Sequence, residues 1–275
     1  MNENINTKET ITNIERSLIK RYRKDIWANF IKSVKEHQMI QDNDKIAVAI
    51  SGGKDSLLLA KLLQQLKKHS NQNFELEFIA MDPGYTKEAR EELEYLCEYL
   101  AIPVKIYNSD VFEVAETLAG ENPCYMCARM RRGFLYSKAE ELGCNKLALG
   151  HHFNDVIETV MLNVLCGGSY KTMMPKLKSK NFENMQLIRP MYEIREKDII
   201  RWINYTGLTA LDCACTVSKK ELGSKRAEIK VLIEELSKTY QNVDLSIFRS
   251  AQNVDKGAIL GWKDGDDYHS YLDEY

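Results

Sequence analysis

A short apolar stretch, residues 46–50, runs directly into the hexapeptide Ser51-Gly-Gly-Lys-Asp-Ser56, and a leucine-rich segment follows. This order predicts a buried strand, a glycine-rich turn and a helix. Two adjacent glycines let the backbone approach a ligand closely, the unpaired amides of the first helical turn attract an anion, and Lys54 adds a positive charge. The hexapeptide therefore predicts a phosphate-binding loop rather than an ordinary turn.

The spacing of these glycines excludes two commoner phosphate-binding loops, Gly-x-x-x-x-Gly-Lys-Ser/Thr and Gly-x-Gly-x-x-Gly. The order instead resembles the pyrophosphate loop (PP-loop) of the ATP pyrophosphatases. Those enzymes split ATP into AMP and pyrophosphate while they adenylate a carbonyl or ureido oxygen. The resemblance implies that the loop residues bind ATP: Ser51, Gly52, Gly53, Lys54, Asp55 and Ser56.

Strand-like runs alternate with helical patterns along the chain. The strand-like runs cover residues 46–50, 76–81, 104–107, 146–149 and 186–189, and the helical patterns cover 57–66, 89–100, 131–141 and 156–165. This alternation predicts an α/β fold with a parallel sheet and helices on both faces. Ligands in such folds bind beyond the carboxyl ends of the strands. We therefore expect Asp82, Gly150 and His151, which follow two of the strands, to line one pocket with the loop.

Apolar residues recur every four positions from Ile14 to Val34, with basic residues between them, so we expect one N-terminal basic helix. It could bind a nucleic acid, pack in a dimer or cover the sheet, and the sequence leaves these roles open. We expect three parts: a helical extension over 1–40, a main domain over 41–255 that carries the glycine-rich loop, and an acidic tail over 256–275 that is loosely ordered from residue 263.

The formal net charge of −2 excludes nucleic-acid binding through the overall field, so any RNA contact needs a local basic face. The first residues are polar, and no apolar stretch is long enough for a signal core or a membrane span. We therefore expect a cytoplasmic protein with no membrane contact. Cysteines stay reduced there, so clustered cysteines indicate a metal or catalysis rather than disulfides.

Two cysteine pairs are clustered, Cys124-x-x-Cys127 and Cys213-x-Cys215. Their spacing is compatible with an iron–sulfur cluster, a structural zinc site, or a redox or unligated pair. Three cysteines on a four-iron cluster would leave one iron without a protein ligand, and that iron could carry a substrate sulfur. The other cysteines lie in apolar surroundings and are interpreted as structural: Cys97, Cys144 and Cys166.

Over most of its length the chain resembles the tRNA 2-thiocytidine synthetases, PP-loop enzymes that thiolate a cytidine in the tRNA anticodon loop. The matching motifs are the loop, Cys124-x-x-Cys127 with Arg131-Arg132-Gly133, Leu149-Gly-His-His152 with Asp155, Pro175-Lys-Leu177, Arg189-Pro190, Arg195-Glu-Lys-Asp-Ile199 and Ser250-Ala-Gln-Asn-Val254. The resemblance implies an adenine nucleotide alpha-hydrolase-like (Rossmann-like) fold, ATP with Mg²⁺, and an oxygen-sensitive 4Fe-4S cluster with three protein ligands.

One motif departs from the family pattern. The family usually has Cys-x-x-Cys at the downstream position, where this chain has Cys213-x-Cys215. By its distance from the Arg195 motif, Cys213 falls at the family's first downstream cysteine. The cluster ligands implied by the resemblance are therefore Cys124, Cys127 and Cys213, with Cys215 as the alternative third ligand.

The resemblance also implies a reaction. ATP adenylates the C2 oxygen of cytidine 32, sulfur delivered at the cluster replaces it, and AMP and pyrophosphate leave. A cysteine desulfurase or another donor would supply the sulfur. Lys54, Asp55 and Asp155 are the expected catalytic residues, with Asp55 helping to hold Mg²⁺ and Asp155 shaping the nucleotide site.

Several roles stay open at this stage. Glu158 is interpreted as a helix-start residue, while His151 and His152 fit either adenylate stabilisation or packing. A homodimer also remains open. Basic residues that bracket the cysteines are candidate tRNA contacts: Arg129, Arg131, Arg132, Lys176, Lys178, Lys180, Lys219, Lys220, Lys225 and Arg226.

Three other functions remain open. One is a paralogue that thiolates another base or a small molecule. A lysidine-type adenylating ligase would share the loop but would not need the cysteines. A non-catalytic tRNA-binding or redox-sensing protein would have little use for Lys54 and Asp55.

Overall fold

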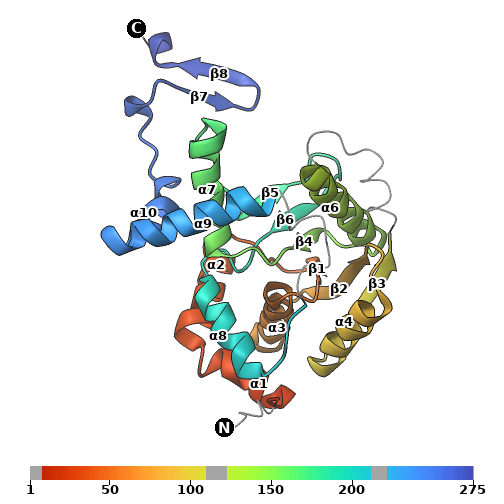
Figure 1. The fold of residues 1–275 in the computed structure, drawn as a ribbon. Coiled ribbons are helices and arrows are strands. Elements are labelled where there is room, and N and C mark those ends of the chain that lie inside the picture. Colours follow the sequence, from red (N-terminus) through yellow and green to blue (C-terminus); the bar gives the residue numbers. More distant parts are fainter. Residues whose placement is uncertain (1–7, 110–122, 212–221, 275) are drawn as a thin grey trace.

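The computed structural model describes residues 8–109, 123–211 and 222–274. In two helices it describes only the backbone of the first residues: side chains are described from Arg129 onward in the helix that begins at Pro123, and from Lys225 onward in the helix that begins at Leu222. Its centre is a six-stranded sheet in the order β3-β2-β1-β4-β6-β5 (Figure 1). The strands are β1 (Lys45–Ala49), β2 (Glu75–Asp82), β3 (Val104–Asn108), β4 (Lys146–Ala148), β5 (Lys176–Lys178) and β6 (Gln186–Ile188). All of them run parallel except β5, an antiparallel edge strand that the sequence patterns did not predict.

Helices surround this sheet. They are α1 (Ile11–Ile19), the π-helix η1 (Arg23–Trp27), α2 (Ala28–Glu36), α3 (Lys54–His69), α4 (Lys87–Tyr99), α6 (Pro123–Glu141), α7 (Phe153–Gly167), α8 (Glu196–Thr206), α9 (Leu222–Thr239) and α10 (Val243–Ser250). Within the described ranges, none of the helices combines the length and the apolar character that crossing a bilayer requires.

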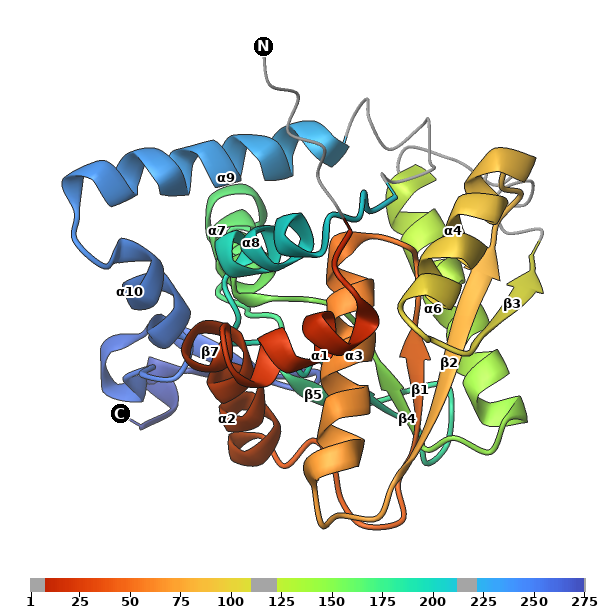
Figure 2. The same cartoon turned by 90° about the horizontal axis from the view of Figure 1, so that it is seen from below.

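Side chains that alternate along β1 pack on opposite faces of the sheet. Ile46 and Val48 belong to the large core formed with α3, α4, α8 and the N-terminal helices. Ala47 belongs to a second cluster, which includes Tyr136 and Ala139 of α6. In Figure 2, α3 and α6 accordingly lie on opposite sides of the sheet, as the predicted α/β architecture requires.

A third apolar cluster attaches α9 to the rest of the molecule. Phe153 and Ile157 of α7 pack against Ile229 and Ile233 of α9, and these four side chains are almost fully buried. α10 packs beside them through Phe248, whose ring stacks on Phe153 with the centroids 4.7 Å apart. This packing fixes one face of α9 against α7, close to the end of β4.

The N-terminal segment is helical, as predicted, but it is divided into three helical pieces. The Tyr22 amide donates to the Ser17 carbonyl (2.8 Å) and the Trp27 amide to the Tyr22 carbonyl (3.2 Å), and both bonds span five residues as in a π-helix. In a continuous α-helix, apolar residues four apart would rotate by about 40° at each step. The wider π turn offsets this drift, and the whole apolar row is buried: Ile14, Leu18, Tyr22, Ile26, Phe30 and Val34.

The C-terminal tail contains a hairpin, so the expectation of a loosely ordered tail was wrong. Its elements are η2 (Lys256–Ala258), β7 (Gly261–Asp264), β8 (Asp267–Ser270) and η3 (Tyr271–Glu274). Trp262 stacks on His269 across the two strands, with the ring centroids 5.2 Å apart. Gly265, with a φ of 64°, takes the left-handed conformation in the turn. The boundary at residue 256 between domain and tail stays a prediction.

Lys61 ties the N-terminal helices to the core, and its loss should destabilise the fold. Its side chain is 1% exposed, and its Nζ donates to Glu15 (2.8 Å), Gln64 (2.7 Å) and the Leu100 carbonyl (2.9 Å). We expect Lys61→Ala to lower the free energy of unfolding by about 3 kcal/mol, because the partly buried Glu15 loses its cation and the buried Leu100 carbonyl loses its donor. Lys68, which is 64% exposed and 3.6 Å from the same Glu15, is the matched control. Lys68→Ala should cost less than about 0.5 kcal/mol, and equal losses in urea unfolding would contradict this account.

Candidate functional site

The glycine-rich loop, residues 51–56, forms the turn between β1 and α3. Gly52 has a φ of 78°, in the left-handed region that favours glycine, and its carbonyl accepts from the Leu211 amide (3.0 Å). Ser56 Oγ closes the turn, because it accepts from the Ser51 amide (3.1 Å) and donates to the Gly53 carbonyl (2.9 Å). Among the described side chains, none caps the N-terminus of α3. The first amides of this helix are therefore available to an anion.

The chain after β4 passes directly beside this loop. A Cβ atom on Gly150 would lie 3.1 Å from the carbonyl carbon of Asp55 and 3.2 Å from the amide nitrogen of Ser56, so a side chain there would crowd the backbone of the loop. β1 and β4 are neighbours at the point where the strand order reverses, with β2 and β3 on one side and β6 on the other. Crevices of parallel sheets open at such a switch point, beyond the carboxyl ends of the strands.

A cavity of about 520 Å³ opens at this point, and its size suits a small-molecule ligand. Apolar side chains such as Ala49, Met81 and Leu149 form part of its wall, which suits a nucleobase. The residues that line it are Ala49, Ile50, Ser51, Asp55, Ser56, Met81, Tyr85, Arg131, Arg132, Leu135, Leu149, Gly150, His151, Asp155, Met173 and Arg189. The cavity thus brings together most of the predicted nucleotide-site segments.

Asp82 takes a different place from the one the sequence analysis expected. Its Oδ1 accepts from the amides of Gly84 (2.9 Å) and Tyr85 (2.7 Å), and its Oδ2 pairs with Arg90 (2.8 Å). These bonds hold the pKa of Asp82 below its usual value despite the opposing effect of burial. Asp82 therefore shapes the turn after β2, while its neighbours Met81 and Tyr85 face the cavity.

The structure separates the two adjacent histidines. His151 lines the cavity, and its buried Nδ1 has no hydrogen-bond partner among the described residues. Burial, together with Arg189, lowers the pKa of His151 to about 4, so it is neutral at physiological pH. His152 instead caps α7, because its side chain accepts from the Asp155 amide (3.4 Å) while Asp155 Oδ2 accepts from the His152 amide (2.8 Å). His152 is therefore the N-cap residue of α7.

Arg189 is a site residue that the sequence analysis named only as part of a family motif. It is 6% exposed and lines the cavity, where its Nη1 donates to the Met174 carbonyl and its buried Nε has no partner among the described residues. Burial lowers its pKa to about 10, so it remains a cation at neutral pH. A buried guanidinium with an unused donor suits an anionic ligand. Its position at the end of the predicted strand 186–189 could have identified it.

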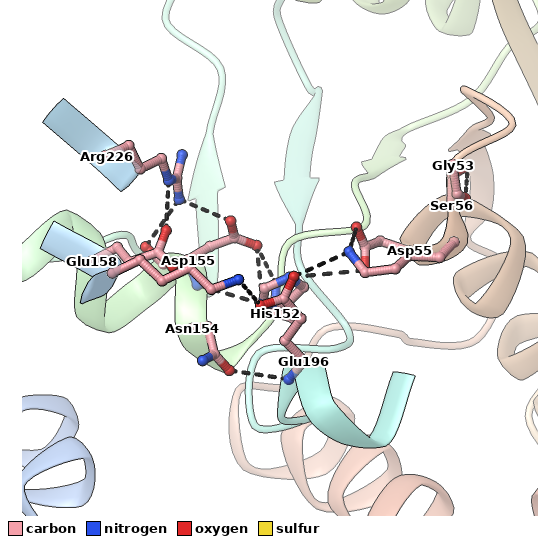
Figure 3. Close-up of polar contacts among 11 residues, drawn as sticks. Gly53, Asp55, Ser56, His152, Asn154, Asp155, Glu158, Glu196 and Arg226 are labelled. Atoms are coloured by element: carbon pink, nitrogen blue, oxygen red, sulfur yellow. Dashed lines mark hydrogen bonds and ion pairs between the residues drawn. The ribbon is translucent and has the colours of Figure 1, made fainter. Parts of the chain in front are cut away.

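Two carboxylates contact Lys54 at the N-terminus of α3. Its Nζ lies 3.1 Å from Asp55 Oδ2 and 3.3 Å from Glu196 Oε1 on α8. Burial raises the pKa of Asp55, although His152 and Lys54 act in the opposite direction. Asp55 Oδ1 is buried without a hydrogen-bond partner among the described residues and lies 3.8 Å from His152 Nε2. Figure 3 shows His152 between Asp55 and Asp155.

Arg226 of α9 joins two acidic residues of α7. Its Nη2 lies 2.8 Å from Asp155 Oδ1 and its Nε lies 2.6 Å from Glu158 Oε2 (Figure 3). Asp155 therefore completes the capping box of α7, pairs with α9 and lines the cavity. Glu158 does more than start a helix, because it holds Arg226 in place. Arg226 was expected as a tRNA contact, but its Nε and Nη2 pair with Glu158 and Asp155.

The cysteines are only partly described. Cys124 and Cys127 lie in the first turns of α6, whereas Cys213 and Cys215 lie outside the described residues, as do the tRNA candidates Lys219 and Lys220. Burial raises the pKa of Cys97 to about 12 and that of Cys144 to about 11, which suits inert structural thiols. Cys166 is exposed, so its interpretation as a packed residue was wrong.

The loop, the strand order and the cavity define a nucleotide-binding domain of the PP-loop class. The family model described as "PP-loop domain" matches residues 22–212. A solved structure, the U34-tRNA thiolase NcsA from Methanococcus maripaludis with its 4Fe-4S cluster, superposes with a TM-score of 0.66 at 26% identity. The superposition covers 82% of this chain and 76% of that chain. The predicted fold class is thus confirmed.

Two relatives bear the name tRNA-cytidine(32) 2-sulfurtransferase. The protein from Vibrio cholerae serotype O1 (strain M66-2) is 35% identical over 251 residues, which is 90% of this chain and 79% of that protein. The protein from Acinetobacter baumannii (strain ACICU) is 36% identical over 242 residues, 86% of this chain and 77% of that protein. The chain therefore belongs to the tRNA-cytidine(32) 2-sulfurtransferase family, which confirms the resemblance found in its motifs.

Gly150→Ala should disrupt the loop, because the added methyl group would meet backbone atoms that cannot move independently. We expect ATP affinity to fall at least about tenfold, measured by calorimetric titration with a non-hydrolysable ATP analogue. Gly133→Ala is the control, since a Cβ at that position of α6 meets nothing within 4 Å. It should leave the affinity unchanged, and unaltered binding by Gly150→Ala would contradict the close approach.

Proposed function

We infer that this chain is an ATP-dependent tRNA sulfurtransferase that replaces the C2 oxygen of cytidine 32 with sulfur and releases AMP and pyrophosphate. The observation that carries this inference is the glycine-rich loop at the strand switch point, in a chain that shares 35% identity over 90% of its length with a tRNA-cytidine(32) 2-sulfurtransferase. ATP fits the cavity beside the loop, which offers an apolar wall and a cationic end.

Adenylation solves the chemical problem of the reaction. A pyrimidine C2 oxygen is a poor leaving group. When this oxygen is bonded to the α-phosphorus of ATP, it can leave the base as part of AMP, which is a good leaving group. The amides at the start of α3 and the Lys54 ammonium can neutralise the charge that develops on the departing pyrophosphate. Arg189, a buried cation on the cavity wall, is suited to the remaining phosphate. Neutral His151 can share a hydrogen bond with the nucleotide without adding charge.

Magnesium is compatible with the carboxylates present. Asp55 Oδ1 is buried without a hydrogen-bond partner among the described residues, and Asp155 lines the same cavity. Mg²⁺ commonly takes one or two protein carboxylates and completes its shell with substrate phosphates and water. We propose that Asp55 holds the ion and that Asp155 shapes the site.

We also propose a 4Fe-4S cluster with Cys124, Cys127 and Cys213 as ligands and Cys215 in reserve. The NcsA thiolase, which carries such a cluster, supports this choice over zinc. When bound, the cluster would offer an iron without a protein ligand, which can present sulfur to the activated base. A cysteine desulfurase or another sulfur donor would be the partner that supplies it. Because tRNA is the substrate, the cytoplasm is the proposed compartment.

Exposed basic residues are proposed to contact the tRNA backbone. Arg129 and Arg132 of α6 are exposed, as are Lys178 and Lys180 at and beyond β5. Arg132 also lines the cavity, so this basic surface reaches the nucleotide site. Such cations bind phosphates without regard to sequence. Lys176 is less suited, because its Nζ donates to the Gln38 carbonyl (2.8 Å).

Lys54→Ala and Asp55→Ala should each lower ATP-dependent formation of 2-thiocytidine by at least about a hundredfold, because the first removes a cation from the phosphates and the second removes the proposed Mg²⁺ ligand. The measurement is nucleoside mass spectrometry of unmodified tRNA incubated without oxygen with ATP, a sulfur source and the enzyme. Lys67→Ala, an exposed change on the same helix, is the control. Normal thiolation by either loop variant would refute the proposed role of the loop.

Protein purified without oxygen should contain about four iron and four sulfide per chain and show visible cluster absorbance. Cys124→Ala, Cys127→Ala and Cys213→Ala should each lose the absorbance and the thiolation activity, whereas Cys215→Ala should keep the cluster. The reverse result for the last two variants would move the third ligand to Cys215. One zinc and no iron would contradict the cluster.

A further inference from the structure

α9 presents two cations to the nucleotide site from positions one turn apart. Arg226 binds Asp155 and Glu158, and Lys230 Nζ lies 2.6 Å from Glu196 Oε2. Residues four apart share one face of a helix. The apolar contacts between α9 and α7 hold this face in place, so both cations are fixed relative to the glycine-rich loop.

Glu196 lies between two lysines. Its Oε1 is 3.3 Å from Lys54 Nζ, while its Oε2 receives Lys230, and its side chain is only 16% exposed. Its backbone amide donates to Asn154 Oδ1 (3.0 Å), which fixes the start of α8 against the start of α7 (Figure 3). Burial acts to raise the pKa of Glu196, but Lys230 and Lys54 outweigh it and the pKa is lowered. Glu196 is thus an anion at neutral pH.

Lys230 balances the negative charge of the carboxylates around Lys54. One ammonium that faces two carboxylates, Asp55 and Glu196, has its charge more than cancelled. Lys230 restores one positive charge within the same chain of contacts. Without Lys230, the loop would meet a triphosphate with a net negative side-chain charge, and charges a few ångströms apart in a partly buried site interact strongly.

We propose that Glu196 is a positioning residue for the Lys54 ammonium, and that Lys230 neutralises Glu196 so that the glycine-rich loop can accept a triphosphate. This inference rests on the proposed function of the loop as an ATP site. Glu196 fixes where the ammonium lies, because its own position is set by Asn154 and Lys230. Helix α9, distant in sequence from the loop, thereby sets the charge that the loop presents to ATP.

The test uses the full chain and a non-hydrolysable ATP analogue in calorimetric titrations at moderate ionic strength. Lys230→Met should weaken binding about tenfold (~1.4 kcal/mol), because Glu196 then cancels Lys54 without compensation. Glu196→Gln should tighten binding about threefold, because both lysines then face the phosphates. The double variant, which restores the original charge balance, should recover most of the binding that Lys230→Met loses.

The control is Lys238→Met on the same helix. Lys238 pairs with Glu235 at 2.5 Å in an exposed position remote from the loop, and its loss should leave the affinity unchanged. Melting temperatures of all variants report on folding. If Lys230→Met does not fold, the ATP-analogue affinity of Glu196→Gln tests the proposal alone. Removal of an ion pair with a merely structural role would not tighten binding of the analogue.

Turnover gives a second readout. Glu196→Gln should lower kcat for thiolation about tenfold while its ATP affinity rises, because Lys54 loses its orienting partner. Weaker binding by Glu196→Gln, or a double variant as weak as Lys230→Met, would overturn the proposal. Failure of the unchanged chain to bind the analogue would instead refute the ATP site itself, and this inference with it.

Discussion

The close approach of two backbone segments underlies the site. The chain after β4 passes the turn at Asp55 and Ser56 so closely that even a Cβ atom at position 150 would crowd their backbone atoms. This contact joins the carboxyl ends of β1 and β4, where the strand order reverses and a crevice must open. The free amides of α3 and the half-buried His151 lie on these two segments, and the cavity opens beside the point where the segments meet.

Charge balance is the second constraint, and it joins segments that are distant in the sequence. The loop supplies Lys54 and Asp55, α8 supplies Glu196, and α9 supplies Lys230. Each charge in this chain has a partner of opposite sign, so partly buried ions are tolerated. A polyanionic ligand must compete with these partners for the lysines. The same ion pairs therefore stabilise the loop before ATP binds and help to determine the ATP affinity.

The sequence predicted the parts of the fold that follow from local patterns. The five parallel strands, the glycine-rich loop and the helical character of the N-terminal segment were predicted correctly, because apolar periodicity and glycine pairs report local geometry. The π turn after Tyr22 and the edge strand β5 were missed, since a three-residue strand and one widened turn leave almost no pattern. Glu196 and Lys230 were missed as site residues because only tertiary packing brings them to Lys54.

The most direct test of the account follows the oxygen that leaves the base. A tRNA anticodon stem-loop with ¹⁸O at the C2 position of cytidine 32 is incubated anaerobically with ATP, a sulfur source and the enzyme. The mass of the released AMP is then measured by mass spectrometry. Adenylation of the base predicts one ¹⁸O atom in the AMP for each 2-thiocytidine formed, with unlabelled pyrophosphate. Unlabelled AMP, or ADP and phosphate as products, would contradict the proposed chemistry.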